Sequence, residues 1–155
     1  MKLRRQFLST AAIASVALFA APALSAPTDI LTGLTLPVGT PQTQGAADTT
    51  QLRFPDGTLI GFVGEADYSI LDDGSIEVRS GNVTVLSGTS PFTVRYGDDT
   101  VEVTGGAALA VSGGQARSHV LNGSATVRSG GSERSYTSGE AWQSDGNGAS
   151  QVVTA

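Results

Sequence analysis

From Gln51 onward, apolar and polar residues alternate in short runs that are separated by Gly, Asp and Asn. The alternation is regular in Ser75–Arg79, Phe92–Tyr96 and Val101–Val103. A period of two places successive side chains on opposite faces of a strand, and Gly with Asp or Asn forms tight turns. No stretch keeps a helical period. The pattern therefore predicts an all-β fold whose strands pack one face and expose the other.

An eight-residue pattern, Gly-x-aliphatic-x-aliphatic-x-Ser-Gly, occurs four times along the chain. Its copies are Gly74–Gly81, Gly81–Gly88, Gly106–Gly113 and Gly123–Gly130. Their irregular spacing excludes a solenoid of fixed period. We expect a single domain of short, glycine-punctuated strands, arranged as two facing sheets or as an irregular β-solenoid. Because Gly106–Gly113 is apolar on both faces, we expect it to be the most buried strand.

The segment Tyr96–Val101 is predicted to be a β-hairpin. If Asp98-Asp99 is its two-residue loop, Tyr96 faces Val101 and Arg95 faces Glu102. This register pairs apolar residues on one face and opposite charges on the other, and both pairings stabilise a sheet.

The remaining chain divides into a signal, a leader and a tail around the β domain predicted at 51–143. Residues 1–25 have the basic start, short apolar run and small-residue exit of a cleaved secretory signal. The pair Arg4-Arg5 followed by Phe7-Leu8 resembles a twin-arginine export signal, and an ordinary basic start for Sec export fits about equally well. We expect 26–50 to be an extended leader pinned by one edge strand, and 144–155 to be a flexible tail with a last short strand.

Composition limits the partners of the exported chain. Cysteine is absent, so disulfides, thiolate metal sites and lipid attachment after the signal are excluded. Removal of Lys2, Arg4 and Arg5 leaves six basic residues against fourteen acidic ones, a net charge of −8. Nucleic acid and anionic membranes would be repelled by this charge. We expect a periplasmic or secreted protein that does not insert into the membrane after signal cleavage.

A series of short motifs runs from Leu52 to Trp142. They are Pro55-Asp56-Gly57-Thr58, Tyr68-Ser69-Ile70, Gly81–Val85, Pro91–Val94, Val101–Gly105, Val120–Val127 and Gly139-Glu140. The order of these motifs resembles that of the FecR domain of bacterial envelope proteins. One departure is Gly105–Ala108, where the family has a bulky aromatic residue and this chain has small ones.

The resemblance implies a β module of the cell envelope that acts by contact. Iron-signalling members of the family look like an anti-sigma segment, a membrane helix, this domain and a secretin-like domain, and we expect this chain to hold the FecR-like domain alone. A binding or structural component is our first interpretation. The alternative is a sensory module that passes a signal to a separate membrane regulator.

Catalytic and metal-binding patterns are weak. His119 is the sole histidine and alternates with Val120, so we expect a surface position and no catalytic base. Glu65, Asp67, Glu77 and Glu102 show no spacing that singles out a glycosidase pair. We therefore expect no enzyme.

Acidic turns offer the one candidate for a bound ion. These turns are Asp72-Asp73-Gly74, Asp98-Asp99 and Asp145–Gly148. Their oxygens suit calcium, but the same residues are what tight turns need, and no complete calcium-loop motif is present. We expect no cofactor, with calcium at these turns as the alternative.

The outward positions of the predicted strands suggest an interaction face. Its members are Glu77, Arg79, Arg95, Glu102 and Arg128, with Trp142 near the end of the domain. Such a face could contact a protein or polysaccharide of the envelope, and a merely solvated sheet is the alternative. Trp142 is either a stacking platform for sugars or a cap on the final turn. Strand edges without lysine also favour self-association by edge pairing.

Overall fold

The computed structural model describes residues 26–145 and 148–152. The signal predicted at 1–25 lies outside the described residues, as do 146–147 and 153–155 of the predicted tail. The described chain consists of strands and turns, which confirms the all-β prediction. Within this part of the chain, no helix is long and apolar enough to cross a membrane.

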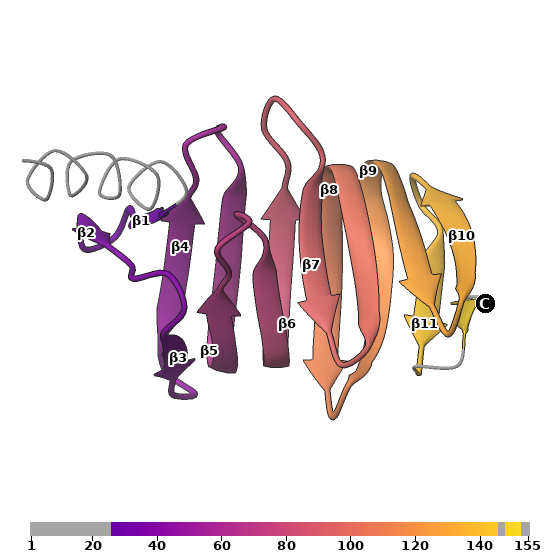
Figure 1. The fold of residues 1–155 in the computed structure, drawn as a ribbon, viewed down its shortest axis with the longest axis horizontal. Coiled ribbons are helices and arrows are strands. Elements are labelled where there is room, and N and C mark those ends of the chain that lie inside the picture. Colours follow the sequence, from indigo (N-terminus) through magenta and orange to yellow (C-terminus); the bar gives the residue numbers. More distant parts are fainter. Residues whose placement is uncertain (1–25, 146–147, 153–155) are drawn as a thin grey trace, which may run out of the picture.

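Within the described residues, twelve strands form one continuous hydrogen-bonded sheet. They are β1 Thr28–Asp29, β2 Leu34–Thr35, β3 Pro41–Gln44, β4 Thr49–Arg53, β5 Leu59–Ile70, β6 Ile76–Leu86, β7 Phe92–Tyr96, β8 Asp99–Ser112, β9 Gln115–Ser129, β10 Ser132–Thr137, β11 Ala141–Ser144 and β12 Ala149–Val152. The strand order is β12-β11-β9-β8-β7-β6-β5-β4-β1-β2, with β3 on β5, β10 on β9 and a further β6–β8 pairing. The sheet extends along the long axis from β2 to the C-terminal strands (Figure 1).

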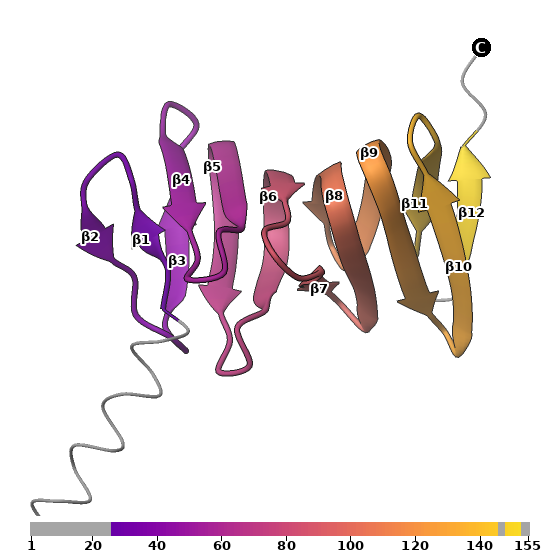
Figure 2. The ribbon, with the colours of Figure 1, turned by 90° about the horizontal axis from the view of Figure 1, so that it is seen from above.

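The four long strands β5, β6, β8 and β9 each pair with different neighbours along their two halves. Layer 1 contains β4, the first half of β5, the second halves of β6 and β8, the first half of β9, β11 and β12. Layer 2 contains β3, the other halves of the long strands, β7 and β10. In Figure 2, β3, β7 and β10 lie along one side and β4 and β11 along the other.

Side-chain contacts show that the two layers face each other. Phe62 and Tyr68 lie six residues apart on β5, about 20 Å in a straight strand, yet their rings stack with centroids 4.1 Å apart. Between the layers, the Tyr96 hydroxyl is 2.7 Å from Ser144 Oγ, and the rings of Tyr136 and Trp142 stack at 5.3 Å. The predicted pair of facing sheets is thus realised as one sheet bent over on itself.

Glycines form the bends. Gly105 on β8 lies opposite Gly123 on β9, and both have positive φ, +101° and +79°. A Cβ on Gly123 would lie 2.0 Å from the Thr104 carbonyl oxygen, and one on Gly105 would lie 2.5 Å from that of Asn122. Gly81, with φ of +126°, forms the bend of β6 close to the bulge of β5. Only glycine fits these positions without strain.

The repeated pattern corresponds to one half-strand bounded by glycine turns or bends. In three copies its aliphatic positions, such as Ile76 and Val78, point into the core. The copy assigned to Gly106–Gly113 is one residue out of phase, because the bend lies at Gly105. Its pattern positions Ala108 and Ala110 therefore lie on the outside, whereas Ala107, Leu109 and Val111 are buried.

The predicted hairpin is present, but its register was wrong by two residues. Tyr96 pairs with Asp99 and Arg95 with Thr100, so the loop is Gly97-Asp98 rather than Asp98-Asp99. Gly97 has φ of +58°, which a tight two-residue hairpin loop requires and which Gly adopts without a steric penalty. A shift of two residues keeps every side chain on its expected face.

The leader predicted at 26–50 joins the sheet more fully than by one edge strand. It forms β1, β2, β3 and the start of β4. Turns at Gly33 and Gly39, both with positive φ, fold it back, and Leu36 and Val38 pack against the core. At the other end, β12 lies within the segment predicted as the tail and pairs with β11.

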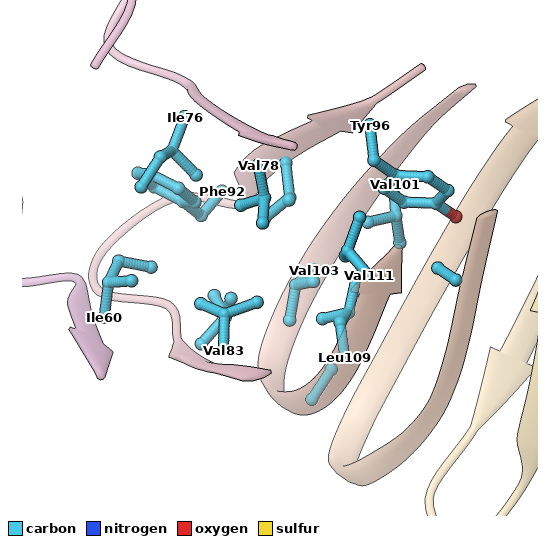
Figure 3. Close-up of a cluster of buried hydrophobic side chains, with 14 of the residues drawn as sticks. Ile60, Ile76, Val78, Val83, Phe92, Tyr96, Val101, Val103, Leu109 and Val111 are labelled. Carbon is cyan, nitrogen blue, oxygen red and sulfur yellow. The ribbon is translucent and has the colours of Figure 1, made fainter. Parts of the chain in front are cut away.

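One hydrophobic core fills the space between the layers. Figure 3 shows its central part, where Ile60 and Val83 of layer 1 approach Ile76 and Val78 of layer 2. These four side chains are at most 2% exposed. Burial of aliphatic side chains of this size stabilises the fold by about 1.5–3 kcal/mol each. The two outer faces of the sheet carry the side chains that point away from this core.

The bends make a prediction about stability. We expect Gly123→Ala to lower the free energy of unfolding by more than about 2 kcal/mol, because it adds a steric clash to the cost of a positive φ. Gly131→Ala is the matched control, since Gly131 also has positive φ (+82°) but a Cβ there meets nothing within 4 Å. Urea unfolding of the chain from residue 26 onward measures both changes, and equal losses would contradict a steric role for the bend.

Candidate binding surface

The charged residues predicted as an interaction face do come together, on the outside of layer 2. Glu77 pairs with Arg95 across β6 and β7, and Arg79 lies two residues further along β6. Glu102 on β8 and Arg128 on β9 lie on the same outer face. The side-chain alternation of four strands thus assembles the set as the sequence predicts.

Most of the cations on this face are already paired within the chain. Arg79 contacts Asp67 at 2.7 Å and Glu77 at 2.9 Å, and Arg95 contacts Asp73 at 3.0 Å. Arg128 contacts Glu133 at 3.1 Å. Hydrogen bonds from Ser75, and then the Arg95 guanidinium, hold the pKa of Asp73 below its usual value. Exposed pairs of this kind contribute little stability, and they leave little unsatisfied charge for a partner.

Trp142 does not belong to the charged face, so its predicted placement there was wrong. It is fully buried and stacks on Tyr136 between the layers. Trp142 on β11 pairs with Ser118 on β9, and paired residues point to the same face of a sheet. Because the Ser118 side chain is buried, the indole of Trp142 points into the core as well. A stacking platform for sugars at Trp142 is excluded by the same burial.

The outer face of layer 1 has a different character. Val63, Leu86 and Leu121 are 66%, 43% and 46% exposed there, and Ile30 beside β4 is 40% exposed. Single exposed apolar side chains are ordinary on protein surfaces, but gathered ones indicate a contact site. Layer 2 shows no large exposed apolar side chain on its outer face within the described residues.

Two adjoining hollows cross this outer face. One, of about 290 Å³, includes Ala108, Ala110, Arg117 and His119 in its lining. The other, of about 310 Å³, includes Ile30, Leu59 and Leu86. Both hollows are lined by Gly61, Val63 and Thr84, so they adjoin across the strands. We call the combined depression the trough. Its lining residues are Ile30, Gln51, Leu59, Ile60, Gly61, Val63, Asn82, Val83, Thr84, Leu86, Ala108, Leu109, Ala110, Arg117 and His119.

The trough is free of carboxylates. Arg117 and His119, both on β9, line one end of the trough. On the β4 side, Arg53 pairs with Leu59, which lines the trough. None of the residues that line the trough is acidic, although the whole chain has 14 acidic against 9 basic residues. His119 lies exposed opposite Ala108 and Ala141, as the alternation predicts. The local surface is therefore apolar with a positive edge on an acidic protein.

Sequence reasoning missed this surface because it assigned Gly106–Gly113 to the interior. The expectation that this would be the most buried strand was wrong, because one of its two faces is left uncovered. Ala107, Leu109 and Val111 are buried, but Ala110 is exposed and Ala108 half-buried. The signal was present in the sequence, since a strand that is apolar on both faces needs a cover on both. The described chain covers only one.

A third hollow, of about 340 Å³, lies among the turns at one edge of the layers. Phe54, Asp56, Asp73 and Phe92 are among its lining residues. Asp56 accepts a hydrogen bond from the Thr58 amide, and Asp73 accepts bonds from Ser75 and Arg95. These carboxylates stabilise their own turns. Among the described residues, no group of three or more His, Cys, Asp or Glu side chains could hold a metal ion.

Comparison with known proteins gives a likeness of fold. No protein-family model matches the chain, and no curated protein matches it. Two crystal structures described as a "putative anti-sigma factor" from Parabacteroides distasonis ATCC 8503 each align with a TM-score of 0.59 at 15% identity. The alignment covers 73% of this chain and 58% of each of those chains. Over the aligned part, this chain thus has the same fold as part of those two structures.

The charged face makes a pH-dependent prediction. Because the pKa of Asp73 is lowered in the folded state, its ionised form stabilises the fold above the ordinary Asp value, and this contribution is lost as the pH falls below it. We expect Asp73→Asn to lower the free energy of unfolding by less than about 1 kcal/mol at pH 7. The difference from the unsubstituted chain should shrink in urea unfolding as the pH falls below the ordinary pKa of Asp and through the lowered pKa of folded Asp73. Asp72→Asn is the control, and a difference that grows in acid would refute the assignment.

Proposed function

We propose that the chain is a non-enzymatic, exported FecR-like β module of the cell envelope that binds a partner protein through the trough. The observation that carries this proposal is the gathering of Val63, Leu86 and Leu121 on one outer face, where the lining of the trough includes no carboxylate. Exposure of apolar surface to water costs a free energy of about 25 cal/mol for each Å² of apolar area. A partner that covers it gains this free energy.

A protein suits the trough better than a polysaccharide does. Sugars are commonly bound by stacking on exposed aromatic rings. All seven aromatic side chains of the described residues are buried, namely Phe54, Phe62, Tyr68, Phe92, Tyr96, Tyr136 and Trp142. The trough instead offers aliphatic side chains and two basic groups, which match the apolar and acidic side chains of proteins.

Catalysis is a poor fit to the same surface. His119 is the sole histidine, and its neighbours across the strands are Ala108 and Ala141. A general base of the triad type needs a nucleophile and an orienting group within hydrogen-bond distance. The trough contains neither a carboxylate nor a thiol beside His119.

Signal transfer to a separate membrane regulator is the second candidate function. The fold likeness to an anti-sigma factor favours it, because proteins of that kind act by protein contact. The FecR-like order of motifs points the same way. Under this reading the partner on the trough belongs to a regulator, whereas in the first it is an envelope component.

Site-specific crosslinking tests the proposed function. The chain has no cysteine, so Ala110→Cys in the trough and Thr126→Cys on the charged face of layer 2 can each carry one photoreactive maleimide. We expect crosslinks to another protein in native envelopes from position 110 and few from position 126. Equal yields from the two positions would refute the trough as the contact surface.

A further inference from the structure

The strands beneath the trough offer a partner no backbone hydrogen bonds. In layer 1, β5 pairs with β4 and β6, β8 pairs with β6 and β9, and β9 pairs with β8 and β11. An extended segment laid on this apolar face would bury its own peptide groups without partners, at a cost of about 1–3 kcal/mol for each group. A helix satisfies its peptide groups internally. The trough therefore favours a helical occupant.

The dimensions of the trough also suit a helix. Leu59 and Val63 both line the trough, four residues apart on β5, which is about 13 Å along a strand. A helix with its side chains is about 10–12 Å across. From β4 to β9 the trough crosses four strand spacings of about 4.8 Å, or roughly 19 Å. This length corresponds to about 13 helical residues at about 1.5 Å each.

Gly61, which lines the trough, is a glycine that its own strand does not require. A Cβ on this residue would meet nothing within 4 Å, and its φ is not in the left-handed region that favours glycine. The backbone of β5 therefore does not require glycine here, although glycine weakens a strand interior. A glycine of this kind suits a place where another molecule comes close to the sheet.

The basic residues at one end of the trough indicate which charges the polar side of the bound helix should carry. Arg117 and His119 line one end of the trough, and Arg117 makes no ion pair within the described residues. Carboxylates beside the apolar stripe of the helix would pair with these groups, whereas basic residues would meet them unfavourably.

We propose that the trough binds an amphipathic α-helix of a partner protein, about 13 residues long, with an apolar stripe and an acidic flank, lying across β4 to β9. This inference rests on the proposed function and specifies the partner. A strand, a second copy of this chain and a flat sheet are the competing occupants.

Synthetic peptides test the chemistry of the occupant. The probe is a fluorescent amphipathic 15-residue peptide with a Leu and Ala stripe flanked by Glu. The controls are the same peptide with Lys flanks and one with a central Pro. We expect the acidic helix to bind the mature chain at least tenfold more tightly than either control in fluorescence anisotropy. Equal affinities, or no binding of the acidic peptide, would overturn the inference.

Substitutions locate the binding. Gly61→Val fills the floor without a clash and should weaken binding of the acidic peptide at least tenfold, while urea unfolding stays unchanged or improves. Arg117→Glu should reverse the preference between the Glu and Lys peptides. Thr126→Val, on the outer face of layer 2, is the control and should change neither. Undiminished binding to the Gly61→Val chain would overturn the placement in the trough.

Mapping the native crosslinks separates this inference from the proposed function. Mass spectrometry of the adduct at Ala110→Cys identifies the partner segment, and circular dichroism of that segment bound to the mature chain reports its conformation. An acidic helical segment supports the inference. A strand, or a segment of this chain itself, overturns the helix but leaves contact through the trough intact. Absence of any adduct overturns both.

Discussion

The bends at glycine are the constraint on which the rest of the structure depends. Gly105 and Gly123 lie opposite each other, and both adopt positive φ at contact distances that exclude a side chain. Because β8 and β9 bend together there, and β5 and β6 bend near Gly81, one continuous sheet becomes two facing layers. Each half-strand then directs one set of side chains into a shared core, and the other set forms an outer face.

The two outer faces differ because the outward-pointing residues of the strands are of different kinds in the two layers. Layer 2 places Arg79 and Arg95 beside acidic residues of its own chain, which satisfies the face internally. Layer 1 places Val63 and Leu86 around the small residues of the trough, and Leu121 is exposed on the same face. A surface whose groups already bond one another gains little from a partner. The unsatisfied apolar face is therefore the stronger candidate site, although the charged face looked more functional in the sequence.

Periodicity in the sequence predicted the strands and their faces but not how the sheet bends. Two-residue alternation assigns Glu77, Arg95 and Arg128 to one face correctly, because that assignment needs only local geometry. It could not place Trp142, whose direction depends on the phase of a short strand paired far along the chain with Ser118. The assignment of Gly106 to the repeat failed because the bend lies one residue earlier, and a shift of one residue exchanges the faces.

Two kinds of glycine follow from these contacts. At Gly123 the backbone conformation and the Thr104 carbonyl both exclude a side chain, so the fold itself accounts for the residue. At Gly61 neither does, since φ is ordinary and the space above is open. Glycine there lowers the β propensity of a strand that a valine would strengthen. The fold alone gives no reason for that loss, and an occupant of the trough that approaches the sheet at Gly61 does.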